Sequence, residues 1–419
     1  MARKARKKRS RVWLIVGCLC ASLALALSVF MRFGGFGTGE SANPEEFAAY
    51  AGTLEDISIP ERAEIIALGE AAHGNVEFQE LKLDVFKRLV ENDGVRAFAL
   101  EGDYGGCERV NRYIHGGEGT ARQAAAAIGF AIYRTEQMAE LITFMREYNL
   151  SAAEGDDLRF YGYDMQRYAY TFSYLMEACR ELGVETGELE KLMDGGGWSS
   201  AYDDTARMET LAQIKRELAG KDNASQAVHL ADMLLQSCEL QSAPGEDQAD
   251  LRDRLMAENV LWIANQERKA GHGRIFVSGH NVHVARWGSH DSMGKLLAKA
   301  MDGRYYVIGT DFYKTCSNMP GGSSGQRANQ VFYSHDPLAK AAKLAGLDIC
   351  WLDFAKASES PELAELISQY LYMGNLGERY AWLMRLLPPS YRMFQPPAVL
   401  YDGMIFVTEA NPTTILDEG

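Results

Sequence analysis

The chain has 419 residues, enough for one large α/β domain with an insertion or for two domains. Its composition of 47% apolar and 24% charged residues is ordinary for a folded globular protein, and the net charge is −14. The first 11 residues hold seven Lys and Arg side chains, so the remainder carries 36 basic against 57 acidic groups. Because binding to a phosphate backbone needs clustered basic residues, this acidic body argues against nucleic acid as a partner.

An uncharged run of 20 residues, Val12 to Met31, follows the basic segment. This length crosses a bilayer core as one helix, and the flanking charges predict a cytoplasmic N-terminus with the body outside. A cleaved signal peptide is the alternative, but no clear A-x-A site follows the run. We therefore predict a single-pass protein of the cell membrane with a basic cytoplasmic tail at 1–11, a transmembrane signal anchor at 12–31, a linker at 32–43 and a folded extracytoplasmic body at 44–419.

Seven cysteines are scattered along the chain, two of them in the apolar run and five in the body. They show no C-x-x-C or other zinc-ligand spacing. We predict that the five in the body are buried structural thiols.

The body begins with a helix predicted over Glu45–Leu54, opened by Pro44. Short apolar runs then recur, each ending at a glycine or a turn: Ile65–Leu68, Val95–Leu100, Leu158–Phe160, Ile275–Val277, Tyr305–Ile308 and Ile405–Val407. Helical patterns separate the first four runs, as in the helix with Phe78, Leu81 and Val85 on one face. Strands that alternate with helices predict an α/β fold with a largely parallel central sheet flanked by helices.

Polar side chains stand directly after these runs: Glu70 and His73, Glu101 and Asp103, Asp164, then His280 and His283. Because the carboxyl ends of parallel strands line one rim of a sheet, we expect residues from these distant segments to converge there. A carboxylate beside an imidazole fixes its tautomer and strengthens it as a base, which favours a catalytic role for Glu70 and His73. Ordinary helix capping and polar lining explain the same two residues without any function.

The segment 171–266 is long and polar with a helical pattern, and it is broken at residues 195–197 and at Pro244-Gly245. We predict a helical subdomain inserted between strands. On its last helix, Arg254 and Glu258 lie at the spacing that permits an ion pair, and charges in such a position usually form a solvated face.

The sequence also offers a candidate serine nucleophile and a candidate metal site. Residues 321–325 match G-x-S-x-G, but a nucleophile elbow needs a strand before it and a helix after it, so Ser323 is read as part of a flexible loop. The five residues Glu70, His73, Glu101, His280 and His283 would also suit a zinc-type ion, although no tight zinc motif is present. We predict no metal and no cofactor.

The body resembles the erythromycin esterase family. The resemblance covers most of residues 60–410 and rests on blocks in a fixed order: Leu68–Gly74 with Glu77, Phe78 and Lys82; Ala97–Asp103; Asn111–Tyr113 with Gly116; Tyr133-Arg134 with Glu136; Phe160–Asp164; Met256–Asn259; Gly279–His283; Met293-Gly294; and Tyr401–Gly403.

The resemblance implies that residues 44–419 form an erythromycin esterase-like hydrolase domain with an α/β core, which cleaves a carboxylic ester by activated water, with a macrolide lactone as a candidate substrate. It suggests His73 as the general base, oriented by Glu70, with Glu101, His280 and His283 lining the cleft. Lys82 and Arg134 would stabilise the oxyanion or position the substrate. We also assign Asp103, Asp164 and Glu258 to substrate binding.

Two alternatives remain at this point. One is a metal-dependent hydrolase or peptidase that uses the same Glu and His residues as ligands. The other is an extracytoplasmic binding protein without catalytic activity.

Overall fold

A computed structural model of the chain describes residues 2–32, 41–288, 291–321, 325–334, 336–385 and 387–417. Most of the predicted linker, together with Ser323, His290 and His335, lies outside the described residues.

The N-terminal segment forms one long helix, α1 (Ala2–Arg32). Its stretch Trp13–Phe30 is long and apolar enough to cross a membrane, and a signal sequence near the N-terminus meets the same criterion. The helix itself is thus as expected, whereas its topology stays a prediction.

Contacts divide the chain into two compact units. The large unit comprises Ser58–Glu70, Phe78–Gly309 and Thr413–Gly419, and the small unit comprises Met1–Ile57, Ala71–Glu77 and Thr310–Pro412.

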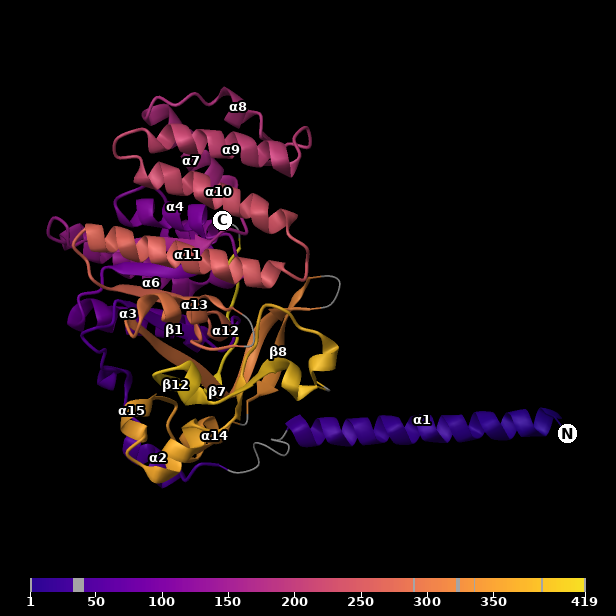
Figure 1. Ribbon diagram of the computed structural model, residues 1–419. Coiled ribbons are helices and arrows are strands. Elements are labelled where there is room, and N and C mark those ends of the chain that lie inside the picture. The colour runs from indigo at the N-terminus through magenta and orange to yellow at the C-terminus, as the bar shows by residue number, and fades with distance from the viewer. Residues whose placement is uncertain are drawn as a thin grey trace. The chain divides into compact units, whose positions relative to one another are not determined.

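The large unit is built on a parallel sheet. Its strands, in spatial order, are β3 (Arg159–Asp164), β2 (Ala97–Asp103), β6 (Ile275–His280), β1 (Ile65–Glu70) and the first part of β7 (Tyr305–Pro320). The pairings of β1 with β6 and β7, and of β2 with β3 and β6, are all parallel. The predicted α/β fold with a largely parallel sheet flanked by helices is therefore confirmed (Figure 1).

The strands of the large unit extend beyond the apolar runs that predict them. β1 continues to Glu70, β2 to Asp103, β3 to Asp164 and β6 to His280. Glu70, Asp103, Asp164 and His280 thus lie at the paired ends of the strands, where backbone pairing restricts their positions.

The helices of the large unit follow the predicted order. α3 (Val76–Asn92), α4 (Tyr104–Ile114), α5 (Ala121–Ala127) and α6 (Glu136–Ser151) alternate with the first three strands. The predicted helical region holds α7 (Ala169–Glu181), α8 (Gly187–Glu190), α9 (Asp204–Ala219), α10 (Ser225–Ser242) and α11 (Gln248–Lys269), with a short hairpin of β4 (Met193–Asp194) and β5 (Gly197–Trp198) at the first glycine break. α12 (Asn281–Val284) and α13 (Met293–Met301) follow β6.

Four aromatic rings form the core between α3 and the sheet. Phe98 of β2 lies with its ring centroid 5.2 Å from Phe86, 5.2 Å from Phe160 and 5.4 Å from Phe276. All four side chains are fully buried. The ring of Phe86 packs α3 against β2 and β6, and the contact between Phe98 and Phe160 links β2 to β3.

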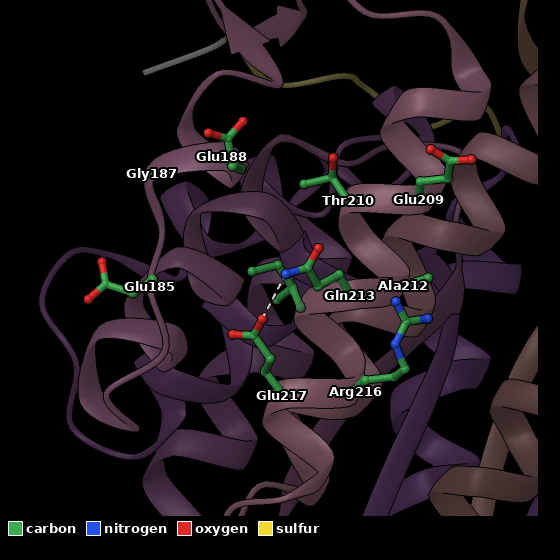
Figure 2. Close-up of a pocket in the computed structure, with 10 residues that line it drawn as sticks. Glu185, Gly187, Glu188, Glu209, Thr210, Ala212, Gln213, Arg216 and Glu217 are labelled. Atoms are coloured by element: carbon green, nitrogen blue, oxygen red, sulfur yellow. Dashed lines mark hydrogen bonds between the residues drawn. The ribbon is translucent and has the colours of Figure 1, made fainter.

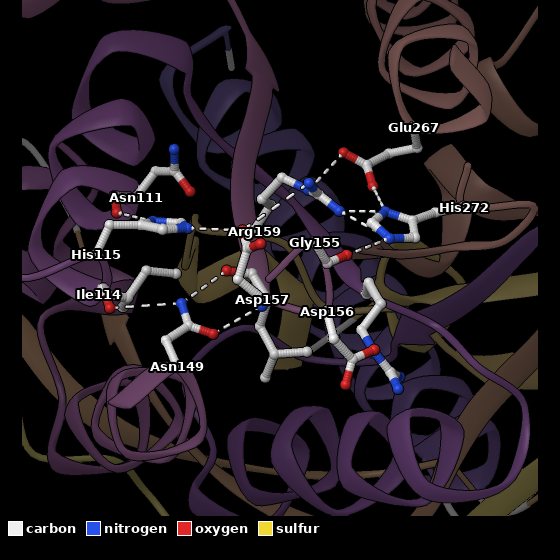
Figure 3. A network of polar contacts seen from close by, with 12 residues as sticks. Asn111, Ile114, His115, Asn149, Gly155, Asp156, Asp157, Arg159, Glu267 and His272 are labelled. Carbon is white, nitrogen blue, oxygen red and sulfur yellow. Dashed lines mark hydrogen bonds and ion pairs between the residues drawn. The ribbon is translucent and has the colours of Figure 1, made fainter. Parts of the chain in front are cut away.

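A polar network holds the N-terminal end of β3 in place (Figure 3). Arg159, the first residue of the strand, pairs with Glu267 at 3.0 Å, and Glu267 also accepts a hydrogen bond from the Tyr161 hydroxyl at 2.6 Å. His272 contacts both Arg159 and Glu267. Nearby, His115 pairs with Asp157 at 3.0 Å. Both histidines thus make polar contacts near the N-terminal end of β3, outside the predicted site.

In the small unit, the strands pair in antiparallel fashion. The rest of β7 pairs with β8 (Arg327–Tyr333), β12 (Gly403–Ala410) pairs with β9 (Ile349–Asp353), and β10 (Leu371–Gly374) pairs with β11 (Arg392–Gln395). Its helices are α1, α2 (Pro44–Tyr50), α14 (Pro337–Leu344), α15 (Phe354–Ala357), α16 (Pro361–Ile367) and α17 (Pro397–Leu400).

Two predicted boundaries are wrong in this unit. α2 ends at Tyr50 rather than Leu54, because Gly52 instead forms an antiparallel bridge with Trp351. The segment before the G-x-S-x-G match is not a loop, since β7 runs as far as Pro320. The next element, β8, is a strand and not a helix, so the match still lacks the context of a nucleophile elbow.

Candidate active site

Polar side chains gather at the carboxyl ends of the parallel strands in the large unit. We call Glu70, Glu101, Asp164, His280 and His283 the strand-end cluster. The parallel register sets Glu70 of β1 beside His280 of β6. Gly279 leaves room for two neighbouring side chains, because a Cβ there would collide with the Tyr163 hydroxyl and lie 3.2 Å from a Glu101 oxygen. A short stretch of regular sheet thereby brings together residues more than 200 positions apart in the sequence.

Glu70 is paired with a buried lysine. The Lys82 ammonium lies 3.1 Å from one Glu70 oxygen, and both side chains are at most 2% exposed. The Gln79 amide donates to the same oxygen at 3.1 Å. Burial lowers the pKa of Lys82, while the carboxylates of Glu70 and Glu101 oppose that shift. The Lys82 ammonium is thus the ion-pair partner of Glu70 at the end of β1, and its role toward a substrate stays a prediction.

Glu101 is held through both of its oxygens. One accepts the backbone N–H of His280 at 2.8 Å, and the other accepts a hydrogen bond from Arg252 at 2.8 Å. The side chain is only 7% exposed. Two donors on a buried carboxylate stabilise its ionised form.

Arg252 also binds Asp164, which is fully buried at the end of β3. The Arg252 guanidinium lies 2.6 Å from one Asp164 oxygen, and the other oxygen accepts the Gln166 N–H at 3.0 Å. Burial disfavours the charge on Arg252, but the carboxylates of Asp164 and Glu101 outweigh it and raise the pKa of the guanidinium. This arginine is consequently a permanent cation within the strand-end cluster.

His283 is oriented by a carboxylate on the same helix as Arg252. Its Nδ1 lies 2.7 Å from Asp253, while its Nε2 lies 3.4 Å from Glu101. Burial alone would lower the pKa of His283, yet Glu101 and Asp253 raise it above its ordinary value. The His280 ring lies 6.4 Å away, centroid to centroid.

Asp103 is a second buried carboxyl near Asp164, its neighbour in the register of β2 and β3. It accepts the Gly106 N–H at 2.8 Å and so caps α4. Burial raises the pKa of Asp103 to about 7, and the nearby Asp164 charge adds to the effect of burial. Asp103 thus holds its proton far above the ordinary range of a carboxyl group.

Two residues of this site, Arg252 and Asp253, were not among the predicted ones. A sequence signal for Asp253 exists: it shares the spacing of Met256, Val260 and Ile263, which form the buried face of α11. A charged side chain in an apolar stripe calls for a partner. Arg254, the next residue, lies on the exposed face, where it pairs with Glu258 at 3.0 Å as predicted.

Three predicted site residues are not joined to the cluster by the contacts described above. His73 follows Glu70 by three positions in the loop before α3 and is 8% exposed. Arg134 lies half-buried directly after a short 3-10 turn at Ala131–Tyr133. Glu258 is 52% exposed on α11. Their assigned roles stay predictions.

The position of Arg252 bears on the metal alternative. Its guanidinium contacts Glu101, Asp164 and His283, the groups that a cation would need as ligands. Within the described parts of the chain, no three His, Cys, Asp or Glu side chains are grouped as a metal site would require. Arg252 thus places a positive charge between Glu101, Asp164 and His283.

A surface cavity of about 790 Å³ lies on the helical region, away from the strand ends (Figure 2). Glutamates dominate its wall, including Glu185, Glu188, Glu209 and Glu217. It shares no lining residue with the strand-end cluster.

Solved structures support the fold. A Bacillus cereus protein superimposes with a TM-score of 0.75 and 18% identity, covering 90% of this chain and 100% of its own. A succinoglycan biosynthesis protein matches with a TM-score of 0.75 and 16% identity over 89% and 98% of the two chains. A mutant of the erythromycin esterase EreC in its open conformation gives a TM-score of 0.58 and 16% identity over 85% and 93%.

Relatives by sequence are distant. Erythromycin esterase type II of Escherichia coli is 25% identical over 59% of this chain and 69% of its own length. A putative hydrolase of Bacillus subtilis, YbfO, is 22% identical over 60% and 66%. The model of the family described as erythromycin esterase matches residues 90–410, a range that includes Glu101, Arg252 and His283 and begins after Glu70 and His73. The chain belongs to the erythromycin esterase family.

Proposed function

We propose that the protein is a membrane-anchored hydrolase that cleaves a carboxylic ester by attack of an activated water. The observation that carries the proposal is the strand-end cluster, in which Glu70 is paired with the buried Lys82 and Glu101 with the half-buried Arg252. Family membership supports the class of reaction. Buried, paired charges at the carboxyl ends of parallel strands are typical of catalytic sites in α/β proteins.

His73 is the proposed general base, with Glu70 orienting its ring. It takes a proton from water as the water oxygen bonds to the ester carbonyl carbon. The carbonyl oxygen becomes an oxyanion, which the cations Lys82 and Arg134 stabilise. When the tetrahedral intermediate collapses, the C–O bond to the alcohol breaks and the imidazolium returns the proton to the leaving alkoxide. Such general base catalysis contributes roughly 10²–10⁴-fold to a rate.

The remaining residues have supporting roles in the proposal. Glu101, His280 and His283 line the cleft, and Asp103, Asp164 and Glu258 contribute to substrate binding. Four of the five cysteines in the body are buried free thiols without the exposure that a nucleophile needs: Cys107, Cys179, Cys238 and Cys350. The fifth, Cys316, is half-buried on β7 rather than buried as predicted, and it is not a member of the strand-end cluster. An activated water therefore fits the site better than a covalent intermediate on cysteine.

A macrolide lactone is the first substrate to try. The name of the Escherichia coli relative, erythromycin esterase type II, supports this choice. A cyclic ester of this kind opens to one chain that carries both a new carboxylate and a new hydroxyl, so its mass increases by one water.

The proposed location is the cell membrane, with α1 as an uncleaved anchor and the body outside. The apolar stretch Trp13–Phe30 and the preceding basic segment support it. An outward-facing hydrolase would meet an ester before it enters the cell.

The test is turnover of erythromycin by the full chain in detergent, followed by mass spectrometry and compared with His73→Ala. We expect a gain of one water in the wild type and a loss of at least ~100-fold in the variant. His115→Ala is the matched control, because His115 pairs with Asp157 at the far end of β3. Full activity of a folded His73→Ala protein would overturn the assignment of the base. A folded wild type that hydrolyses no ester in a broad panel would favour the binding-protein alternative.

A further inference from the structure

Two adjacent residues of opposite charge on α11 contact the same histidine from different sides. Arg252 directs one guanidinium nitrogen at His283 Nε2, 3.2 Å away, and Asp253 lies 2.7 Å from Nδ1 of the same ring. In Figure 1, α11 lies beside α13, the second of the two short helices that follow β6. Successive residues point about 100° apart on a helix, so one helix reaches both edges of the imidazole.

The Asp253 carboxylate is fixed in place. The oxygen that faces His283 also accepts the backbone N–H of Met293 at 3.1 Å, and the side chain is 2% exposed. A carboxylate in this position accepts a hydrogen bond from Nδ1–H, so Nε2 is the nitrogen left to exchange a proton.

The Nε2 atom lies between a donor and an acceptor. Arg252 has only protons to offer, so its contact is satisfied when Nε2 carries a lone pair. Glu101, whose oxygen lies 3.4 Å from Nε2, is satisfied when Nε2 carries a proton. Arg252 also donates to that same Glu101 oxygen at 2.8 Å. The two protonation states of His283 therefore have one stabilising partner each.

We propose that Arg252 and Asp253 are positioning residues that act on His283 in opposite directions: Asp253 fixes the Nδ1 tautomer and favours the imidazolium, and Arg252 favours the neutral ring. The pair keeps the proton on Nε2 exchangeable with Glu101. This inference rests on the proposed function for its purpose, since an exchangeable proton beside Glu101 is useful to an ester hydrolase.

Among the described residues, the charged and titratable groups that face His283 come from three elements. α11 supplies Arg252 and Asp253, β2 supplies Glu101, and β6 supplies His280. From β3, Asp164 acts through its ion pair with Arg252. The substitutions below change one of these groups at a time.

The experiment measures the pKa of His283 in the full chain in detergent, without substrate. Hydrogen–deuterium exchange at the imidazole C2 carbon, read by mass spectrometry of peptides, gives this value for each histidine. Asp253→Asn keeps the oxygen that accepts both hydrogen bonds but removes the charge, and we expect the pKa of His283 to fall by about one unit. Arg252→Met removes the opposing cation, and we expect a rise of similar size.

Controls separate this result from general loss of structure. Arg254→Met changes the next cation on the exposed face of α11 and should leave the pKa of His283 unchanged. Arg252→Met leaves Glu101 and Asp164 without their cation, so Arg252→Lys serves as a variant that keeps the charge and should shift the pKa upward by less. Shifts of the same sign in Asp253→Asn and the two Arg252 variants, or no shift in Asp253→Asn, would overturn the inference.

The same variants also test whether the protonation of His283 affects catalysis, and the titration itself requires no ester turnover. If esters are hydrolysed, the limb of the pH profile of kcat/KM that reports His283 should move with its measured pKa in Asp253→Asn. A shift in the titration without any ester turnover would contradict the proposed function and leave the inference standing.

Discussion

At the scale of single residues, Asp103 gives a direct prediction about pH and stability. Burial raises its pKa in the folded protein to about 7, whereas an unfolded chain has the ordinary value near 3.8. Between these values the folded state binds more protons than the unfolded state, so stability falls as pH rises from about 4 to about 7 and is constant above that. At high pH the folded protein carries the full cost of a buried charge.

Asp103→Asn should remove this dependence. An asparagine oxygen can still accept the Gly106 N–H that caps α4. The difference in free energy of unfolding between variant and wild type should therefore grow in favour of the variant by up to about 4 kcal/mol between pH 4 and pH 8. Urea unfolding of both proteins at several pH values measures it. A difference that stays constant over this range would contradict the raised pKa.

The sequence predicted which polar residues follow the strands, and the structure shows why it did not reveal their partners. Glu70, Glu101, Asp164 and His280 are terminal or near-terminal strand residues, so a short apolar run followed by a polar residue is enough to find them. Arg252 pairs with Asp164 and Glu101 across 88 and 151 positions of sequence, and Asp253 contacts His283 and Met293 across 30 and 40 positions. The position of α11 near the strand ends arises only in the folded protein. From sequence alone, a helix with charges on two faces is usually predicted to lie exposed to solvent.

At the scale of elements, the aromatic core under α3 should determine the stability of the large unit. Phe98→Ala would leave a cavity among Phe86, Phe160 and Phe276, all fully buried. We expect a loss of about 3–5 kcal/mol in the free energy of unfolding, measured by urea denaturation. Leu150→Ala, at a position on α6 that is 78% exposed, is the control and should change little. An equal effect of the two substitutions would show that the ring contacts do not hold the sheet.

Among the elements, the parallel strands were predictable and several antiparallel ones were not. Buried parallel strands read as continuous apolar runs, as in β1 and β2. β8 has the mixed sequence Arg327–Tyr333 and depends on its pairing with β7, a long-range contact that local pattern does not encode. β9 does have four consecutive apolar residues, but a run of this length does not distinguish a strand from a buried helix.

At the scale of the whole molecule, α1 decides where the protein is found. If it is an uncleaved anchor, the protein should remain in the membrane pellet after alkaline carbonate extraction, and its intact mass should include residues 1–31. Leu19→Lys with Leu23→Lys should move the protein into the soluble fraction, since a charged residue at a helix centre costs about 2.5–3.5 kcal/mol on insertion. A soluble wild-type protein whose mass begins after this segment would show that it is a cleaved signal sequence.

The central claim is that this protein hydrolyses an ester by activating a water molecule, and a single turnover in H₂¹⁸O tests it most directly. With the full chain in excess over erythromycin, we predict one ¹⁸O atom in the new carboxylate of the product, no ¹⁸O in any Asp or Glu of the protein, and loss of product formation in His73→Ala. Label found in a protein carboxylate would establish a covalent acyl intermediate instead. A folded chain that adds no water to erythromycin or to any ester of a broad panel would contradict the account.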